Sequence, residues 1–274
     1  MRIQAIRPTL PDLFFMPLLR IFFQLFWIAC CSVSLLAQTR FLLGMPLELG
    51  WLDGFVFGGT VFGYHFTHPN QRYRILAWIM GLLGGFCFLM IQPNNFGAHW
   101  IILAPVLFWL AYYGFQKPGN TGLRGHPIAK PLTIALSWAW VTVFLPTPPE
   151  QWTDLFFLFS GRAAFIFALA LAYDLSDTAY DQRHGLRTLA GKLGTERTFA
   201  LIYKSLLASG ICVGINAYLG IYGISAALAL LVSLIWSGLW LRYIWQQKAW
   251  EDWQKPLIDG LMVLQFLLVF LFKT

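Results

Sequence analysis

The chain has 274 residues, of which 58% are hydrophobic and only 11% are charged, and its formal net charge is +7. Soluble domains carry about 25% charged residues, so this composition excludes an ordinary soluble domain and predicts an integral membrane protein. No polar linker, repeat array or low-complexity tract divides the sequence, and we expect a single transmembrane domain over residues 1–274.

Stretches of roughly 20 apolar residues predict nine membrane-spanning helices and therefore an all-α fold. In chain order they are Leu18–Ala37, Leu49–Phe66, Tyr73–Ile91, His99–Phe115, Pro131–Leu145, Leu155–Tyr173, Thr198–Leu219, Ile224–Tyr243 and Leu257–Phe272. The pairs Gly58–Gly59 and Gly84–Gly85, in the second and third segments, are typical of helices that pack closely in a membrane. The four cysteines lie in apolar runs without zinc-site spacing, and we expect them to be packing residues.

The basic residues predict the orientation of these helices. If the N-terminus is cytoplasmic, 16 of the 19 Lys and Arg fall on the cytoplasmic side of the nine helices. This distribution follows the positive-inside rule and predicts a multi-pass protein, of a bacterial inner membrane, with its C-terminus outside. The positive charge is then explained by topology, and we expect membrane lipids rather than nucleic acid as partners.

Three aspartates follow the sixth predicted helix in the stretch "YDLSDTAYDQRHGLRTLAGKLG", residues 173–194. At helical spacing Asp174, Asp177 and Asp181 share one face. Neither Asp174 nor Asp177 has a Lys or Arg three or four positions after it, where it would cancel the charge. The repulsion within this stripe predicts an external cation, and its hard oxygen ligands suit Mg²⁺, which completes its shell with substrate phosphates. The alternative is a solvated acidic helix end that is balanced by the basic residues after it.

The stretch resembles the second aspartate-rich motif of the UbiA-type intramembrane prenyltransferases, which reads D-x-x-D-x-x-x-D, then G-x-x-T-L and a closing L-G. The resemblance implies nine helices around a central cavity, with this motif after the sixth. It also implies transfer of a prenyl group from a polyprenyl diphosphate to a lipid-soluble acceptor, with Asp174, Asp177 and Asp181 as catalytic residues that hold Mg²⁺. Five basic residues are then expected to bind the substrate diphosphate: Arg72, Lys130, Arg183, Arg187 and Lys192.

The sequence departs from that family where a first motif, N-D-x-x-D-x-x-x-D, is expected after the second helix. Residues 60–74 read "TVFGYHFTHPNQRYR" instead, and no Asp or Glu lies between Asp53 and Glu150. His65 and His68 are poorer Mg²⁺ ligands than carboxylates, and hydrogen bonding at the membrane interface explains them more simply. A second hypothesis therefore stays open: a non-catalytic relative that binds an isoprenoid lipid or diphosphate, or acts as a membrane partner protein.

Two other charged residues lie within predicted helices. Arg162 is about 12 Å into the sixth at 1.5 Å per residue, so it either faces the interior of the bundle or extends to the outer interface. Asp259, near the start of the ninth, is predicted to pair with a loop cation. Aromatic residues around the fourth and fifth helices, such as Trp138 and Trp140, either line an isoprenoid tunnel or fill packing space, and we favour packing.

Overall fold

A computed structural model describes residues 10–65, 74–91, 126–178, 188–246 and 254–273. Helices, with short turns between them, make up this part of the chain, which contains no strand. The helices are α1 (Leu10–Leu42), α2 (Trp51–His65), α3 (Arg74–Met90), α5 (Ala129–Ala139), the π-helix η4 (Trp140–Phe144), the short 3₁₀-helix η5 (Pro149–Gln151), α6 (Phe156–Ser176), α8 (Leu189–Leu193), α9 (Thr195–Tyr218), α10 (Ile224–Gln246) and α11 (Gln254–Lys273).

Eight of the nine predicted segments coincide with helices within a few residues, apart from an earlier start of α1 at Leu10. The fourth, His99–Phe115, lies outside the described residues. Among the described residues, five helical segments are long and apolar enough to cross a membrane: Phe23–Leu42, Phe156–Ser176, Thr195–Tyr218, Ile224–Gln246 and Lys255–Phe272. Shorter apolar helices cover Ile75–Met90 and Ala129–Phe144. The structure therefore confirms a helical fold for the described residues and is compatible with a multi-pass membrane protein, while the number nine stays a prediction.

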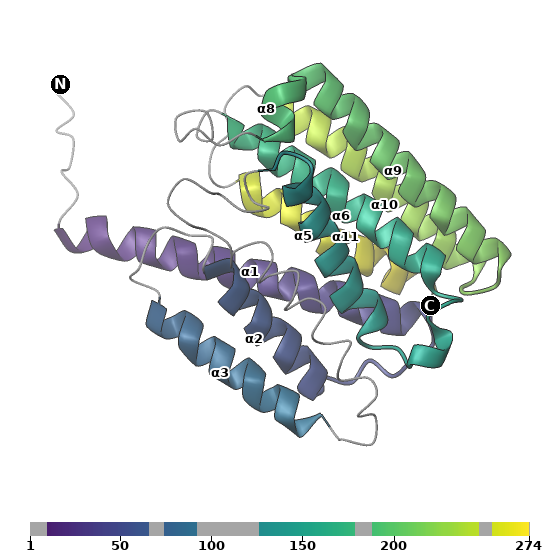
Figure 1. Cartoon of the computed structure of the whole chain (residues 1–274), viewed down its shortest axis with the longest axis horizontal. Helices are drawn as coiled ribbons and strands as arrows, with labels where there is room; N and C mark the ends of the chain where they lie inside the picture. The colour runs from purple at the N-terminus through teal and green to yellow at the C-terminus, as the bar shows by residue number, and fades with distance from the viewer. Residues whose placement is uncertain (1–9, 66–73, 92–125, 179–187, 247–253, 274) are drawn as a thin grey trace, which may run out of the picture.

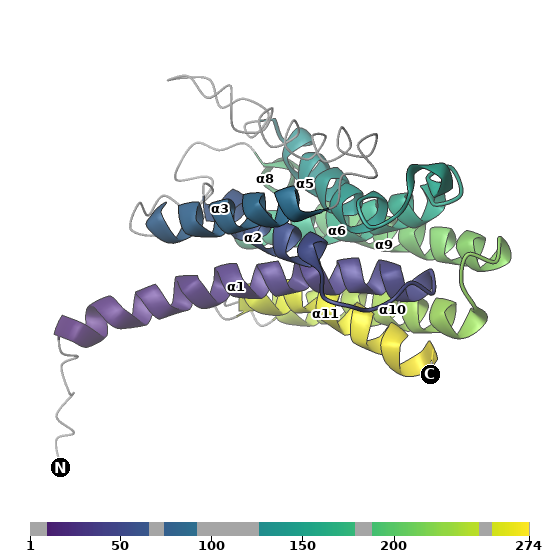
Figure 2. The same cartoon turned by 90° about the horizontal axis from the view of Figure 1, so that it is seen from below.

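Helix α1 crosses the molecule between two groups of helices (Figure 1). The α2–α3 hairpin lies on one side of it, and α10 and α11 lie on the other, as the view from below shows (Figure 2). The main core joins α1 to α5, α6 and α8–α11 through buried apolar side chains, whereas a smaller cluster around Leu25, Ala29 and Val61 holds α2 against α1. The α2–α3 hairpin is thus held to the rest of the bundle by fewer buried apolar side chains than the other helices are.

Glycines set the distance between α2 and α3. A Cβ atom built on Gly58 would come within 2.5 Å of the Met80 carbonyl oxygen and 3.0 Å of the Gly84 Cα atom. The two helix backbones are therefore nearly in contact, as the small-residue pattern of the sequence predicted. Gly59, on another face of α2, has no neighbour within 4 Å of such a Cβ atom.

The ion pairs of the described chain lie at the two ends of the bundle. The end that holds the last turn of α6, called the Asp174 end below, also holds the first turns of α5 and α11. Arg40 and Asp53 pair at the opposite end, where Arg40 Nη1 lies 2.9 Å from Asp53 Oδ2 and joins the end of α1 to the start of α2.

Candidate functional site

The first two aspartates of the motif occupy different depths at the end of α6. Asp174 is 1% exposed and lies in the last turn, next to the buried Leu171 and Leu175. Asp177 is the residue at which α6 ends, and its side chain is 32% exposed. Thr178 assists this ending, because its hydroxyl donates hydrogen bonds to the carbonyl oxygens of Asp174 and Leu175, each at 3.0 Å. The site therefore has one carboxylate inside the bundle and one at its rim.

Each of these carboxylates is paired with a lysine from another helix. Lys130 Nζ, at the start of α5, lies 2.5 Å from Asp174 Oδ1. Lys255 Nζ, at the start of α11, lies 2.6 Å from Asp177 Oδ1. Removing one partner of a buried pair costs about 3–5 kcal/mol, whereas an exposed pair contributes at most about 1 kcal/mol. The Lys130–Asp174 pair is therefore the structurally demanding one.

These ion pairs bear on one sequence expectation. The stripe was expected to need a cation from outside it, because none occurs at the neighbouring helical positions. The two cations come instead from lysines that are 44 and 78 residues away in sequence. Helical spacing relates only residues of the same helix, so it could not predict these two lysines of other helices. In the described structure Asp174 and Asp177 are thus each paired with a lysine.

The other predicted site residues divide into described and undescribed positions. Asp181, Arg72, Arg183 and Arg187 lie outside the described residues, as do residues 66–73, which follow the second helix. Lys192 is exposed on the short helix α8. Lys130 is the one predicted phosphate ligand that the described structure places beside an aspartate of the motif.

The closing residues of the motif have structural roles in the turn between α6 and α9. Thr188 caps the N-terminus of α8 by accepting a hydrogen bond from the Gly191 N–H at 3.2 Å. Leu189 and Ala190 are buried against the core. Gly194 has φ = +73°, a backbone conformation that favours glycine, and it joins α8 to α9. The T-L and L-G parts of the motif thus shape the connection after the aspartates.

A second set of contacts fastens α11 to α6 beside the site. The Tyr173 hydroxyl is hydrogen-bonded to Asp259 Oδ2 and lies 2.8 Å from the Lys255 carbonyl oxygen. The partner that the structure gives Asp259 is therefore a tyrosine of α6, while the basic loop residues 183, 187 and 248 lie outside the described residues. Lys255 is the site residue that the sequence analysis missed, since it was counted only as a topological charge. Its position directly before Pro256, at the start of a predicted helix, was the available signal.

The donor set of the site is compatible with Mg²⁺ when a substrate completes it. Mg²⁺ is usually held by one or two carboxylates together with substrate phosphates and water. Asp174 and Asp177 supply two carboxylates three residues apart, and Asp181 lies outside the described residues. Within the described ranges, no group of three or more His, Cys, Asp and Glu side chains could hold a metal. The residues fit a metal bound together with a phosphate better than a metal held by protein alone.

Comparisons with known proteins add no assignment to this geometry. No family model, no curated protein and no solved structure matches the chain. The likeness of residues 173–194 to the UbiA-type motif therefore depends on the motif residues themselves.

Proposed function

We propose that the chain is a UbiA-like membrane prenyltransferase, which moves a prenyl group from a polyprenyl diphosphate to a lipid-soluble acceptor with the help of Mg²⁺. One observation carries the proposal: two motif carboxylates at the end of a membrane-spanning helix lie in contact with two lysines from other helices. Such a cluster combines ligands for a cation with cations for phosphate oxygens. Its place at the end of an apolar bundle suits a substrate with an anionic head and an apolar chain.

The two lysines are the described residues best placed to receive the diphosphate. Lys130 and Lys255 keep 22% and 31% of their side chains exposed, so each ammonium group is accessible from the rim of the bundle. A diphosphate competes with the carboxylates for these ammonium groups, and each lysine that turns to a phosphate oxygen frees an aspartate. Asp174 and Asp177 are then available to Mg²⁺. Mg²⁺, when bound, neutralises charge on the departing diphosphate.

An apolar groove beside α5 supports an isoprenoid as the second half of the substrate. The groove has a volume of about 320 Å³, and it lies between α5, α6 and α9. It is lined by Leu132, Ala135, Ala163, Ala164, Phe167, Lys204, Ser205 and Ala208. Small alanine side chains leave the space, and the helix that begins beside it carries Lys130. We assign the prenyl chain to this groove and the diphosphate to the Asp174 end.

The test is the thermal stability of the full chain in detergent, with and without Mg²⁺ and farnesyl diphosphate. A ligand at 100 times its Kd stabilises the folded state by about 2.7 kcal/mol, so the wild-type protein should gain stability only when both are present. Asp177→Asn should lose most of this gain. In the ligand-free protein it should cost no more than about 1 kcal/mol, because its ion pair is partly exposed. Glu196→Gln, which removes an exposed carboxylate from the first turn of α9, is the matched control and should keep the full gain.

A non-catalytic binding protein is the second candidate, and two observations favour it. The sequence has no carboxylate between Asp53 and Glu150, and each of the two described motif aspartates is paired with a lysine. This candidate predicts stabilisation by farnesyl diphosphate with no Mg²⁺ dependence, and no transfer of a labelled prenyl group to any membrane-extracted acceptor. The absence of stabilisation by either ligand would contradict both candidates.

A further inference from the structure

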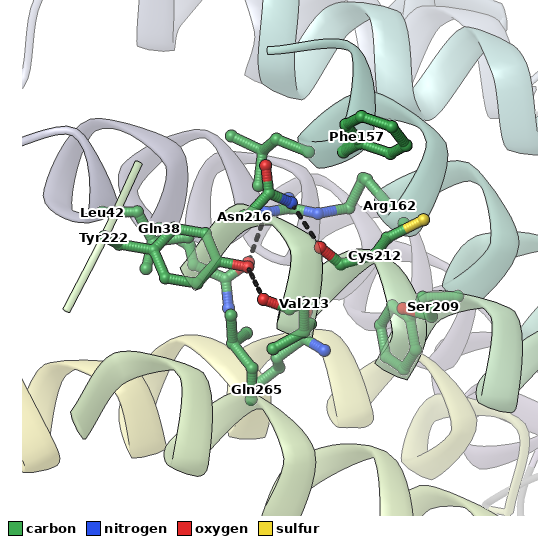
Figure 3. Close-up of a pocket in the computed structure, with 14 residues that line it drawn as sticks. Gln38, Leu42, Phe157, Arg162, Ser209, Cys212, Val213, Asn216, Tyr222 and Gln265 are labelled. Carbon is green, nitrogen blue, oxygen red and sulfur yellow. Dashed lines mark hydrogen bonds between the residues drawn. The ribbon is translucent and has the colours of Figure 1, made fainter. Parts of the chain in front are cut away.

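A second polar cluster lies within the apolar core, away from the motif. Arg162 is 5% exposed, which confirms the interior alternative for this residue. It lies twelve residues before Asp174 on α6, or about 18 Å along the helix axis at 1.5 Å per residue. The side chains of Gln38, Arg162, Asn216, Tyr222 and Gln265, from α1, α6, α9, the α9–α10 turn and α11, converge there (Figure 3). All five are buried.

The positive charge of Arg162 is not compensated by an acidic side chain of the described residues. Its guanidinium donates to the Leu35 carbonyl oxygen at 3.1 Å, to Thr142 Oγ1 at 3.4 Å and to Gln38 Oε1. All three acceptors are neutral, and a guanidinium has further N–H groups beyond these three bonds. Burial raises the pKa of the Tyr222 hydroxyl above its ordinary value, so this group is neutral and is not the counter-ion. Keeping an isolated charge in the core costs several kcal/mol, which gives a strong reason for a bound counter-charge.

A cavity beside this charge has room for a small ligand. Its volume is about 20 Å³, and Arg162, Gln38, Ser209, Asn216 and Tyr222 are among the residues that line it. One water needs about 10–15 Å³, so the cavity holds one water-sized or slightly larger particle and excludes phosphate or an organic acid. Gln38 Nε2 and Asn216 Oδ1 are buried there without a hydrogen-bond partner in the described structure. Gln38 Nε2 and the remaining guanidinium N–H groups are donors available to a ligand, and Asn216 Oδ1 is an acceptor.

The local backbone also departs from a regular helix at this point. The π-helix η4 follows α5 directly and contains Thr142, which is fully buried. The Thr142 hydroxyl donates to the Trp138 carbonyl oxygen at 2.8 Å, and its oxygen is thereby turned toward Arg162. Single π-helical turns are often found at functional sites in proteins. Here the π-helical turn supplies Thr142 Oγ1, a hydrogen-bond acceptor for the Arg162 guanidinium.

We propose that this cavity binds a small inorganic anion of about the size of chloride, with Arg162 as its charged anchor and Gln38 Nε2 as a further donor. The anion neutralises the buried guanidinium and links α1, α6 and the α9–α10 turn. This site is independent of the proposed transferase function. It lies in the half of α6 that is distant from the motif, and its ligand differs from a diphosphate in size.

The test measures the thermal stability of the full chain in sodium bromide, sodium chloride and sodium gluconate at equal ionic strength. Bromide and chloride should raise the Tm of the wild-type protein in a saturable manner by about 3 °C, and gluconate, which is too large for the cavity, should not. Gln38→Glu places a carboxylate beside Arg162 and should remove the halide dependence while keeping a high Tm in gluconate. Arg197→Gln removes an exposed arginine of α9 and should keep the halide dependence unchanged.

Crystals of the wild-type chain grown in sodium bromide give a second measurement that needs no variant. The anomalous signal should show a bromide ion in contact with the Arg162 guanidinium. A water molecule at that position, an equal Tm in all three salts, or a halide dependence that survives in Gln38→Glu would each overturn the proposal.

Discussion

The Lys130 ammonium group lies 2.5 Å from Asp174 Oδ1 and joins the first turn of α5 to the last turn of α6. The Asp174 side chain is 2% exposed, so this lysine gives a buried carboxyl group a cationic partner. The pair fixes the relative position of two helices on which the candidate site is built.

Replacing Lys130 by methionine should therefore destabilise the protein by about 3–5 kcal/mol, because the buried carboxylate loses its partner. Unfolding of the purified protein in increasing denaturant measures this loss. The double variant Lys130→Met with Asp174→Asn should recover part of it, since the buried charge is then removed. Lys192→Met, at an exposed position, should stay within about 0.5 kcal/mol of the wild type. Equal effects of the two lysine substitutions would show that the Lys130–Asp174 pair does not form.

The Tyr173 hydroxyl is in contact with two acceptors, the Lys255 carbonyl oxygen and the Asp259 carboxyl group. A single hydroxyl proton cannot form strong hydrogen bonds with both partners. We therefore expect Asp259 to be protonated and to donate a hydrogen bond to the tyrosine oxygen. Asp259→Asn, whose amide also donates, should then change the free energy of unfolding by less than about 1 kcal/mol. Tyr173→Phe leaves the Lys255 carbonyl oxygen without this donor and the Asp259 proton without its acceptor, and it should cost about 1–3 kcal/mol. A loss for Asp259→Asn as large as for Tyr173→Phe would mean that the carboxylate is ionised.

Gly58 and Gly59 form a matched pair for testing the α2–α3 contact. Gly58→Ala should destabilise the hairpin by about 1–3 kcal/mol, because its Cβ atom would meet the Met80 carbonyl oxygen at 2.5 Å. Gly59→Ala has open space around its Cβ atom and should be neutral or slightly stabilising, since alanine favours a helix. Limited proteolysis in detergent, with cleavage sites mapped by mass spectrometry, compares how readily the hairpin opens in the two variants. The opposite ranking would show that α2 and α3 are not in close contact.

Blocking the apolar groove should separate long from short prenyl donors if the groove holds the prenyl chain. Ala164→Trp fills space that α6 leaves beside α5 and α9. We expect this variant to lose at least tenfold in affinity for farnesyl diphosphate and to bind dimethylallyl diphosphate as the wild type does. Calorimetric titration in the presence of Mg²⁺ provides both affinities. Equal losses for the two donors would place the chain elsewhere.

The orientation predicted from the basic residues places the two termini on opposite sides of the membrane. A reporter fused after Thr274 should be active on the outer side of the membrane, and one fused before Met1 should be active in the cytoplasm. A cytoplasmic signal from both fusions would show an even number of spanning helices.

The sequence by itself determined where the apolar helices lie, because burial in lipid requires long apolar segments and leaves little freedom in their placement. It also located Asp174 and Asp177 at the end of a helix and Arg162 within the same helix, since these positions depend only on local order. The partners of these charges were decided by the tertiary structure alone. Lys130, Lys255 and Gln38 reach α6 from helices that are distant in sequence, and helical periodicity relates only residues of the same helix. The burial of the two aspartates was also decided by the tertiary structure. Asp174 is buried and Asp177 is partly exposed, because other helices cover the first position and leave the second at the rim of the bundle.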